Sequence, residues 1–424
     1  MLVRFFENCR GGVAPLVAIT ALPLMAAVGG AIDYTRASAA RTAFQNALDA
    51  TALMLSRSAA TQSAADLQTT ATNTFNALFT QADASNVAVS ATYASNSGSK
   101  VVLTGTATIK TDFLSILGIN QININASATS TWGNTRLRVA LVLDNTGSMS
   151  SSGKITALKT AAKGLLTQLS AAATSPDDVY VSIIPFSKDV NLNPANYSQS
   201  WLRWDLWEAA NGTCSSTRYT SQKSCLSAGK TWTPAAHSTW NGCVTDRDQN
   251  FDTTNDAPVA GSTLYPAEQY SSCPARVLGL SNDWTALSSE VDAMQPNGNT
   301  NQAIGLQLGW QSLTAAPFSI PPEDPNYQYN DVIILLTDGL NTEDRWYTNI
   351  SSINTRQQIT CDNIKAANIT LYTVQVNTDG DPTSTLLQNC ASDPGKFFLL
   401  TSASQMITTF SQIGTALSNL RLSM

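Results

Sequence analysis

The sequence predicts an α/β protein built on a doubly wound, mostly parallel sheet. From residue 136 onward, five nearly continuous apolar runs are typical of strands that are covered on both faces: residues 137–144, 179–186, 331–338, 369–376 and 396–400. Between and after these runs lie segments with a helical spacing of apolar residues: 155–169, 282–294, 301–313, 352–367 and 402–420. Strands that alternate with helices in this way form parallel sheets with helices on both faces.

One interval, at about residues 191–281, interrupts this alternation. It is rich in turn residues and contains four of the seven cysteines and five tryptophans: Trp201, Trp204, Trp207, Trp232 and Trp240. We interpret it as a single disulfide-rich insertion. Its aromatic residues predict a small core for the insertion itself, and an adhesive face is the alternative.

The cysteines indicate disulfides that form after export. No pair has the C-x-x-C spacing of zinc and redox motifs, and Cys9 precedes the first hydrophobic segment. An even number of cysteines remains, as a disulfide framework requires: Cys214, Cys225, Cys243, Cys273, Cys361 and Cys390. Cys361 and Cys390 lie outside the insertion and are expected to pair with each other, while the connectivity of the other four is left open.

The composition argues against several classes of function. The 424 residues include 24 Lys+Arg and 30 Asp+Glu, so the net charge of -6 makes a cationic surface for nucleic acid unexpected. Charged residues make up 13%, about half the usual share, which suits an exported surface. A single histidine, His237, excludes a His-rich zinc site and leaves little for acid–base catalysis. Because the G-x-S-x-G motif is also missing, we expect that the protein is not an enzyme.

Residues 11–32 form a hydrophobic segment without a charged residue. As a helix this segment would span about 33 Å, enough to cross a hydrocarbon core of about 30 Å, so we expect a transmembrane helix within residues 1–33. Arg4 and Arg10 precede it, which predicts a cytoplasmic N-terminus with everything after Asp33 outside. A cleaved signal peptide is the alternative.

Residues 34–133 have a pattern of their own. A helical spacing of apolar residues continues to about residue 81, and alternating strand patterns follow from residue 86 to residue 132. A membrane helix that continues into an exposed helix and then a small sheet is the plan of a pilin-like subunit, and a simple stalk is the alternative. The predicted domains are therefore 1–33, 34–133 and 134–424.

Oxygen-bearing side chains gather where the predicted parallel strands end. The carboxyl ends of such strands share one edge of the sheet, which is where open α/β proteins bind ligands. Asp144, Thr146 and Ser148 follow the first strand, Asp338 ends another strand, and Thr300 lies in the loop 297–300 that leads into a helix. Two carboxylates and three hydroxyls, with no soft ligand, predict a site for Mg²⁺ or Mn²⁺. Because hydroxyls are neutral, the cation would stay electron-poor and would seek an anionic oxygen from outside.

The pattern Asp144-x-Thr146-x-Ser148, followed by Thr300 and Asp338, resembles the metal-ion-dependent adhesion site of von Willebrand factor A domains. The resemblance implies a von Willebrand factor A-like fold. It also implies that Thr146 and Ser148 bind the cation directly and that Thr300 binds it directly or through water. Asp144 and Asp338 would bind mainly through water, and the sixth position would be left for an Asp or Glu of a partner.

The whole chain is similar to TadG-type proteins of bacterial tight-adherence (Flp) pilus systems. The similarity rests on the run Arg-Gly-Gly-Val-Ala-Pro-Leu before one hydrophobic segment, on the pilin-like part, and on the A domain, which ends in Cys390-Ala391-Ser392 and residues 417–422. It implies a non-enzymatic pilus assembly or anchoring factor in the bacterial inner membrane, with its bulk in the periplasm and surface association as a further option. Its partners would be pilus subunits or other pilus-assembly or envelope proteins that offer an Asp or Glu. A surface adhesin that binds host or abiotic surfaces through the Trp-rich insertion is the alternative.

A second acidic motif, Asp246-x-Asp248-x-Asn250, begins like a calcium-binding loop. Phe251 stands where such loops need a glycine, and Ala257 stands where they need a bidentate Glu. We therefore predict an ordinary turn cluster, with a calcium site outside the EF-hand class as the alternative.

Overall fold

The computed structural model forms two compact units. The first comprises the residues up to Asn134, and the second runs from Thr135 to Ser423. The structure describes residues 13–59, 62–94, 99–132, 135–325 and 327–422. Each unit buries a hydrophobic core of its own.

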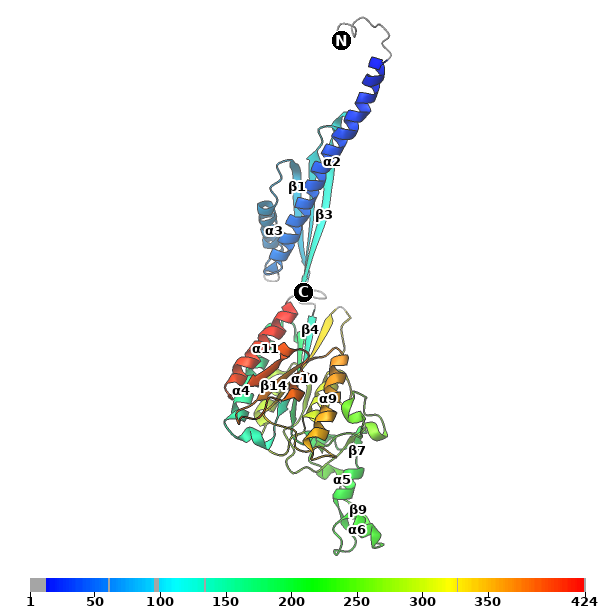
Figure 1. The fold of residues 1–424 in the computed structure, drawn as a ribbon, viewed down its shortest axis with the longest axis vertical. Helices are drawn as coiled ribbons and strands as arrows, with labels where there is room; N and C mark the ends of the chain where they lie inside the picture. Colours follow the sequence, from blue (N-terminus) through cyan, green and yellow to red (C-terminus); the bar gives the residue numbers. More distant parts are fainter. Residues whose placement is uncertain (1–12, 60–61, 95–98, 133–134, 326, 423–424) are drawn as a thin grey trace. The chain divides into compact units, whose positions relative to one another are not determined.

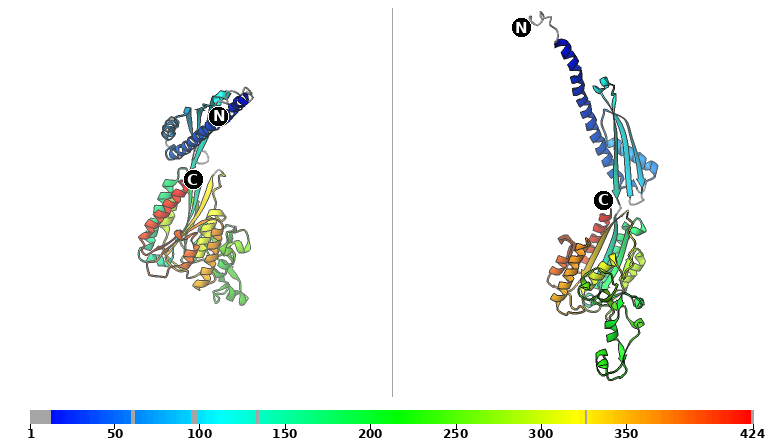
Figure 2. Two further views of the ribbon diagram at one scale, coloured as in Figure 1. Left: turned by 45° about the horizontal axis from the view of Figure 1, so that its top comes forward. Right: turned by 90° about the vertical axis from the view of Figure 1, so that its right-hand side faces the viewer.

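The first unit packs two helices against a small antiparallel sheet of order β1-β2-β3 (Figures 1 and 2). Its elements are α2 (Val13–Leu55), α3 (Ala64–Leu78), β1 (Ala84–Ala94), β2 (Ser99–Lys110) and β3 (Gln121–Trp132). Alternate side chains of β2 are buried, as expected of a sheet with one covered face. The Phe44 ring lies edge-on to Phe75 and Phe79 at centroid distances of 5.0 and 5.1 Å, so three aromatic rings form the centre of this core.

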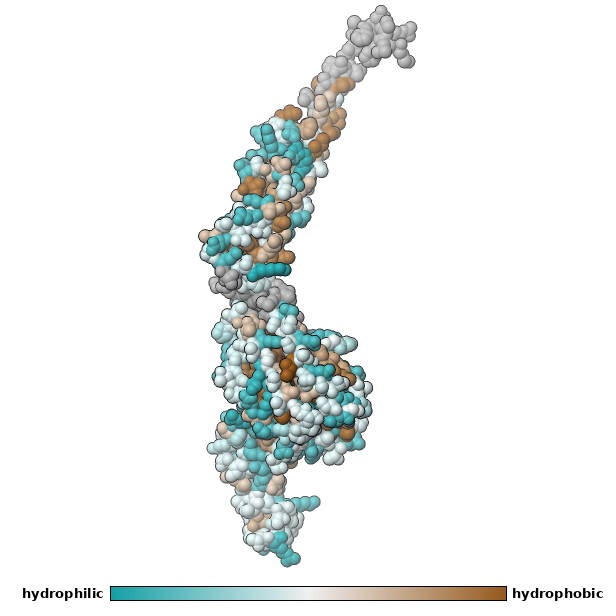
Figure 3. All heavy atoms as spheres, turned by 90° about the vertical axis from the view of Figure 1, so that its left-hand side faces the viewer, coloured by the Kyte–Doolittle hydropathy of each residue, from teal (hydrophilic) through white to brown (hydrophobic). Residues whose placement is uncertain are grey.

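The structure does not support the expected transmembrane helix. Among the helices in the described part of the chain, none is both long and apolar enough to cross a membrane. The prediction also falls partly outside the described residues, which exclude residues 11 and 12 and the side chains of residues 13–16, 18 and 22. The first half of α2 does expose large apolar side chains, including Leu24, Met25 and Val28 (Figure 3).

The loop between β2 and β3 is fixed against α2. It contains the short 3₁₀ helix η2 (Leu114–Leu117). The Asp33 carboxylate of α2 accepts hydrogen bonds from the backbone N–H groups of Asp112, Phe113 and Leu114 at 3.1, 2.8 and 2.8 Å. A Cβ atom on Gly29 would lie 2.5 Å from Phe113, so only glycine permits this close approach. The loop and the helix therefore form one body.

The second unit is built on a mixed sheet of strand order β10-β6-β5-β4-β13-β14-β15. Five strands run parallel: β4 (Thr135–Asp144), β5 (Val179–Phe186), β13 (Gln328–Thr337), β14 (Thr370–Val376) and β15 (Phe397–Leu400). The antiparallel strands are β6 (Val190–Asn191), β10 (Cys243–Val244) and β12 (Leu278–Ser281), which pairs with β5. The predicted α/β class is confirmed. The antiparallel strands belong to the insertion and its borders.

Helices cover both faces of this sheet (Figures 1 and 2). One layer consists of α4 (Lys154–Ala172), α7 (Trp284–Ala293) and α11 (Gln405–Leu422), and the other of α8 (Gln302–Thr314), α9 (Ile350–Ala366) and α10 (Thr385–Cys390). Along β4, Val139 and Leu141 belong to the first core, whereas Ala140 and Val142 belong to the second. Both sides of β4 are therefore buried, which is why its sequence is a continuous apolar run.

The insertion folds into short elements that are held by two disulfides. They are η5 (Pro194–Asn196), β7 (Leu202–Arg203), α5 (Asp205–Ala210), β8 (Gly212–Cys214), α6 (Gln222–Ser227), β9 (Trp232–Pro234), η6 (His237–Thr239), η7 (Phe251–Thr253), η8 (Gly261–Thr263) and β11 (Tyr265–Pro266). The bonds are Cys214–Cys225 and Cys243–Cys273, and a third, Cys361–Cys390, joins α9 to α10. Trp207, Trp232 and Trp240 are only 1%, 8% and 2% exposed. Trp207 and Trp240 belong to the same hydrophobic cluster as Ala140 and Val142 of β4, so the insertion packs onto one face of the sheet and does not form the separate small core that its aromatic residues predicted.

Candidate metal site

The candidate site lies where β4 and its neighbour β13 end. Asp144 is the last residue of β4, and the following turn leads through Thr146 into the 3₁₀ helix η3 (Gly147–Ser150), which carries Ser148. Asp338 directly follows β13, and the parallel register pairs Leu336 with Leu143. This register brings the two carboxylates to the same edge of the sheet, as the sequence predicted.

Hydrogen bonds orient both oxygens of Asp144. Its Oδ1 accepts from the backbone N–H of Thr146 at 2.8 Å and from the Thr146 hydroxyl at 2.6 Å. Its Oδ2 accepts from the Thr337 hydroxyl at 2.7 Å. Asp144 is fully buried, and burial together with the nearby charge of Asp338 raises its pKa to about 6.

The two hydroxyls of the turn face each other between the carboxylates. Ser148 Oγ donates to Asp338 Oδ1 at 2.6 Å and lies 3.0 Å from Thr146 Oγ1. Each hydroxyl has one proton, and here Asp144 and Asp338 accept both. No proton is then left between Thr146 and Ser148, so both hydroxyl oxygens keep lone pairs for a further ligand. A hard cation would stabilise this arrangement of oxygens.

Thr300 lies in the adjoining loop. The backbone N–H of Gly147 donates to the Gly298 carbonyl at 3.0 Å, which holds residues 297–300 against the turn after β4. The Thr300 N–H donates to the Thr342 hydroxyl at 2.8 Å, and its carbonyl accepts from the Thr342 N–H at 2.9 Å. Thr300 is 4% exposed and directly precedes Asn301, the N-cap of α8. The structure thus brings four predicted residues into one hydrogen-bonded group and places the fifth in the next loop.

Two residues at the site escaped the sequence analysis, Thr337 and Lys154. Lys154 begins α4, is 1% exposed, and places Nζ 2.6 Å from Asp338 Oδ2 and 3.1 Å from Asp379 Oδ2. Burial lowers the pKa of Lys154, but the hydrogen bonds and charges of Asp338 and Asp379 outweigh it and raise the pKa. A cation in the first turn opposes the helix dipole, and this anomaly was the available signal.

The donors fit a hard divalent cation. They are carboxylate and hydroxyl oxygens, which suit Mg²⁺ or Mn²⁺. Throughout the described residues, no group of three or more His, Cys, Asp or Glu side chains could hold a metal. A cation held by the residues around Asp144 and Asp338 would bind hydroxyl as well as carboxylate oxygens.

The carboxylates of the motif Asp246-x-Asp248-x-Asn250 form hydrogen bonds within the protein. Asp248 accepts hydrogen bonds from the guanidinium groups of Arg203 and Arg345, which hold its pKa far below the usual value. Asp246 accepts from the Asn301 amide at 2.9 Å. Both carboxylates therefore serve contacts within the protein, as an ordinary turn cluster requires.

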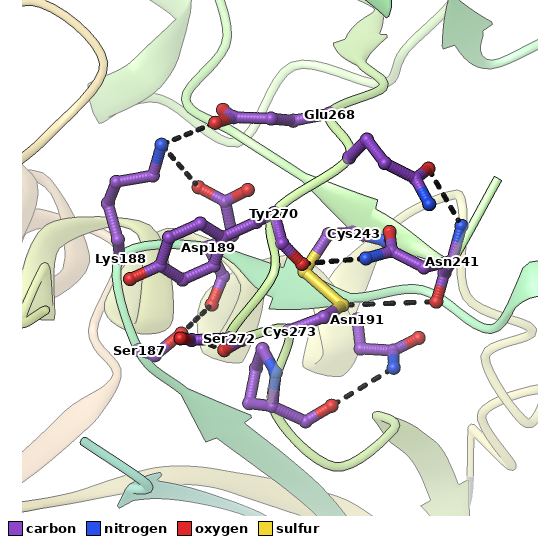
Figure 4. Close-up of a disulfide and its surroundings, with 12 residues drawn as sticks. Ser187, Lys188, Asp189, Asn191, Asn241, Cys243, Glu268, Tyr270, Ser272 and Cys273 are labelled. Atoms are coloured by element: carbon purple, nitrogen blue, oxygen red, sulfur yellow. Dashed lines mark hydrogen bonds and ion pairs between the residues drawn. A yellow bond between two sulfur atoms is a disulfide. The ribbon is translucent and has the colours of Figure 1, made fainter. Parts of the chain in front are cut away.

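A second buried ion pair lies beside the Cys243–Cys273 disulfide (Figure 4). The Lys188 ammonium lies between the carboxylates of Asp189 and Glu268, and the Asp189 side chain is fully buried. Burial, followed by the charge of Glu268, raises the pKa of Asp189 well above its usual value. The turn with Lys188 and Asp189 accepts a hydrogen bond from the Asn301 backbone N–H at the Ser187 carbonyl, so it supports the start of α8.

His237 has a structural environment within the insertion. Its ring stacks on Trp204 at a centroid distance of 3.8 Å, and its Nε2 lies 2.8 Å from Glu208 Oε1. These contacts give His237 a packing role in the insertion.

Comparison with protein-family models gives two matches. Residues 11–62 match the Flp pilus-assembly TadE/G-like family, and residues 264–412 match the von Willebrand factor type A domain. The second match contains Thr300 and Asp338 but begins after Asp144. The structure shows that β4, with Asp144 at its end, is the neighbour of β13 in the same sheet. The predicted von Willebrand factor A-like fold is thus confirmed, and the insertion separates its first strands from the rest. No curated protein matches the chain.

Comparison with solved structures finds remote likenesses. Pilus adhesin SpaC from Lactobacillus rhamnosus GG is 14% identical over 80% of this chain and 35% of its own, with a TM-score of 0.39. The vWF domain of the type V pili tip protein Mfa5 from Porphyromonas gingivalis is 10% identical over 68% of this chain and 97% of its own, with a TM-score of 0.39. Proximal thread matrix protein 1 from the mussel byssus, with a zinc-occupied MIDAS motif, is 13% identical over 68% of this chain and 47% of its own, with a TM-score of 0.36. This chain spans about a third of SpaC. Likenesses this remote carry no argument about function.

Proposed function

We propose that this chain is a non-enzymatic assembly or anchoring factor of a tight-adherence pilus in the bacterial envelope. The proposal is supported by the match of residues 11–62 to the Flp pilus-assembly TadE/G-like family and of residues 264–412 to the von Willebrand factor type A domain. One observation carries the proposal: hydrogen bonds join Asp144, Thr146, Ser148 and Asp338 into one group of oxygens at the end of the sheet. In such a factor this group binds a partner through a cation.

Thr146, Ser148 and Thr300 would hold Mg²⁺ or Mn²⁺, with Asp144 and Asp338 bound through water. Both carboxylates already accept hydrogen bonds from neighbouring hydroxyls. The oxygens of the hydroxyls are therefore more available as direct ligands of the cation. The bound cation supplies a positive centre for an acidic side chain. Ser148 is exposed, so a partner's Asp or Glu can approach from solvent. Pilus subunits or other pilus-assembly or envelope proteins are the proposed partners.

The alternative function, a surface adhesin that binds host or abiotic material through the Trp-rich insertion, has less support. Trp207, Trp232 and Trp240 are buried within the second unit and cannot offer their rings to a surface. Deletion of residues 191–281 would test it, since attachment should then be lost while pili remain.

A cation-dependent capture experiment tests the proposed function. The full-length chain, with Ser148→Ala and Asp338→Asn variants, is incubated with envelope extract in Mg²⁺ or in EDTA, and captured proteins are identified by mass spectrometry. We expect pilus-system proteins to be captured only by the parent chain in Mg²⁺. Ser150→Ala is the matched control, because Ser150 lies on the same turn and donates only to the Gly147 carbonyl. Equal capture by the parent in EDTA and by both site variants would overturn the proposal.

A further inference from the structure

We infer that Lys154 is a positioning residue that sets the charge of the candidate metal site, weakening its hold on the cation while strengthening its attraction for an acidic partner. The inference rests on the proposed function and adds a residue to it. Its starting point is an ammonium group that is nearly inaccessible to solvent yet lies 2.6 Å from a carboxylate of the site.

The two oxygens of Asp338 face different groups. Oδ1 accepts from Ser148 Oγ at 2.6 Å, on the side where the hydroxyls gather. Oδ2 lies 2.6 Å from Lys154 Nζ, on the other side. Lys154 therefore leaves the hydroxyl side of Asp338 open to a cation. Its ion pair with Oδ2 draws the charge of the carboxylate away from the hydroxyls.

The charge balance follows from these contacts. The two buried carboxylates and the one buried ammonium carry one net negative charge, and a divalent cation turns it into one net positive charge. Without Lys154, the same cation would leave the site neutral. Because charges interact strongly in a buried environment, the doubly negative site without Lys154 would bind the cation more tightly. Once it holds the cation, that site would be neutral and would attract a carboxylate less.

Asp379 provides a counterpart of opposite sign. Its carboxylate lies 3.1 Å from the same ammonium, but its side chain is 59% exposed, so solvent screens its charge. It belongs to the loop between β14 and α10. Without the negative charge of Asp379, less of the positive charge of Lys154 would be compensated. The site should then have a lower affinity for a cation and a higher affinity for an acidic partner.

The test measures two affinities on full-length protein. Binding of Mn²⁺ alone is followed by calorimetry, and binding of a synthetic Asp-rich peptide to the Mn²⁺-saturated protein is followed by fluorescence anisotropy. For Lys154→Met we expect about tenfold tighter Mn²⁺ binding and about tenfold weaker peptide binding. For Asp379→Asn we expect both changes with the opposite sign and a smaller size, since Asp379 is exposed.

A control variant and the parent chain make the outcomes distinct. Lys163→Met removes a charge from the same helix at a pair with Asp292 whose side chains are 39% and 54% exposed, so it should change neither affinity. Lys154→Met leaves Asp338 buried without its partner, and if it fails to fold, Asp379→Asn decides alone. Loss of Mn²⁺ binding in Lys154→Met, or no change of either affinity in Asp379→Asn, would overturn the inference. If the parent chain itself binds no Mn²⁺, the proposed function fails with it.

Discussion

Thr337 Oγ1 donates a 2.7 Å hydrogen bond to Asp144 Oδ2, which ties the end of β13 to the end of β4. Both atoms belong to fully buried residues. Thr337→Val should therefore cost about 1–3 kcal/mol of stability, because a buried carboxylate loses a donor. It should also weaken Mn²⁺ binding, since Asp144 would no longer be held in place. Urea unfolding and calorimetry measure the two effects.

Thr373 is the matched control for this prediction. It is equally buried in the neighbouring strand β14, and its hydroxyl donates to the Leu387 carbonyl at 2.8 Å. Thr373→Val should lower stability similarly and leave Mn²⁺ binding unchanged. The prediction is wrong if both variants bind Mn²⁺ alike, whatever their stability.

Two glycines let α8 lie close to the sheet, and their replacement should destabilise the second unit. A Cβ on Gly309 would lie 2.5 Å from Val142, and one on Gly305 would lie 2.8 Å from Phe186. Gly309→Ala should cost about 1–3 kcal/mol, since the core is overpacked. Gly164→Ala in α4 meets no atom within 4 Å and should instead stabilise by about 0.5–1 kcal/mol. Urea unfolding followed by circular dichroism measures both variants. The argument is wrong if the unfolding midpoints of Gly309→Ala and Gly164→Ala shift in the same direction.

The Cys214–Cys225 disulfide should stabilise the end of the insertion alone. It closes a short loop with a sequence separation of 11 and joins β8 to α6. A loop of this size contributes about 3 kcal/mol by chain entropy. In Cys214→Ser/Cys225→Ser, hydrogen exchange should become faster in residues 212–234 and stay unchanged in β4 and β13, whose core lies in the sheet. Loss of protection in those strands as well would show that the insertion supports the whole fold.

The positions of Asp144 and Asp338 at one edge of the sheet could be predicted because β4 and β13 are buried on both faces and therefore have long apolar runs. Their carboxyl ends, with Asp144 and Asp338, follow from the order of the elements. The role of Lys154 could not be predicted, since it depends on how α4 packs beside the end of β13. The antiparallel strands of the insertion were also missed, because two-residue strands such as β6 have no periodicity to detect.

Asp33 should make the first unit less stable as the pH falls into the acidic range. Burial would raise the pKa of Asp33, but the N–H groups of Asp112, Phe113 and Leu114 outweigh it and hold the pKa below its usual value of 3.8. A lowered folded pKa means that its contribution to stability is present above that value and is lost as the pH falls through the folded pKa. Asp33→Asn should destabilise the unit at pH 6 and have less effect at pH 2. Thermal unfolding of the full chain at both pH values measures the difference, and an equal effect at both would exclude this role.

Asp246 should have the opposite effect on the second unit. Burial, followed by the charge of Asp344, raises its pKa to about 7, although hydrogen bonds from Asn301 and Arg345 oppose this. A raised folded pKa favours the protonated folded state, so its contribution is fully present below the unfolded value of 3.8 and is lost as the pH rises through about 7. Asp246→Asn keeps an oxygen for Asn301 and removes the charge. The variant should therefore match the parent near pH 4 and exceed it in stability at pH 8.

Asp331→Asn is a useful comparison, because burial raises the pKa of Asp331 only to about 6. The stability that this variant gains over the parent should therefore reach its full size at a lower pH. A variant of Asp246 that is less stable than the parent at pH 8 would show that the ionised carboxylate is favourable in the fold.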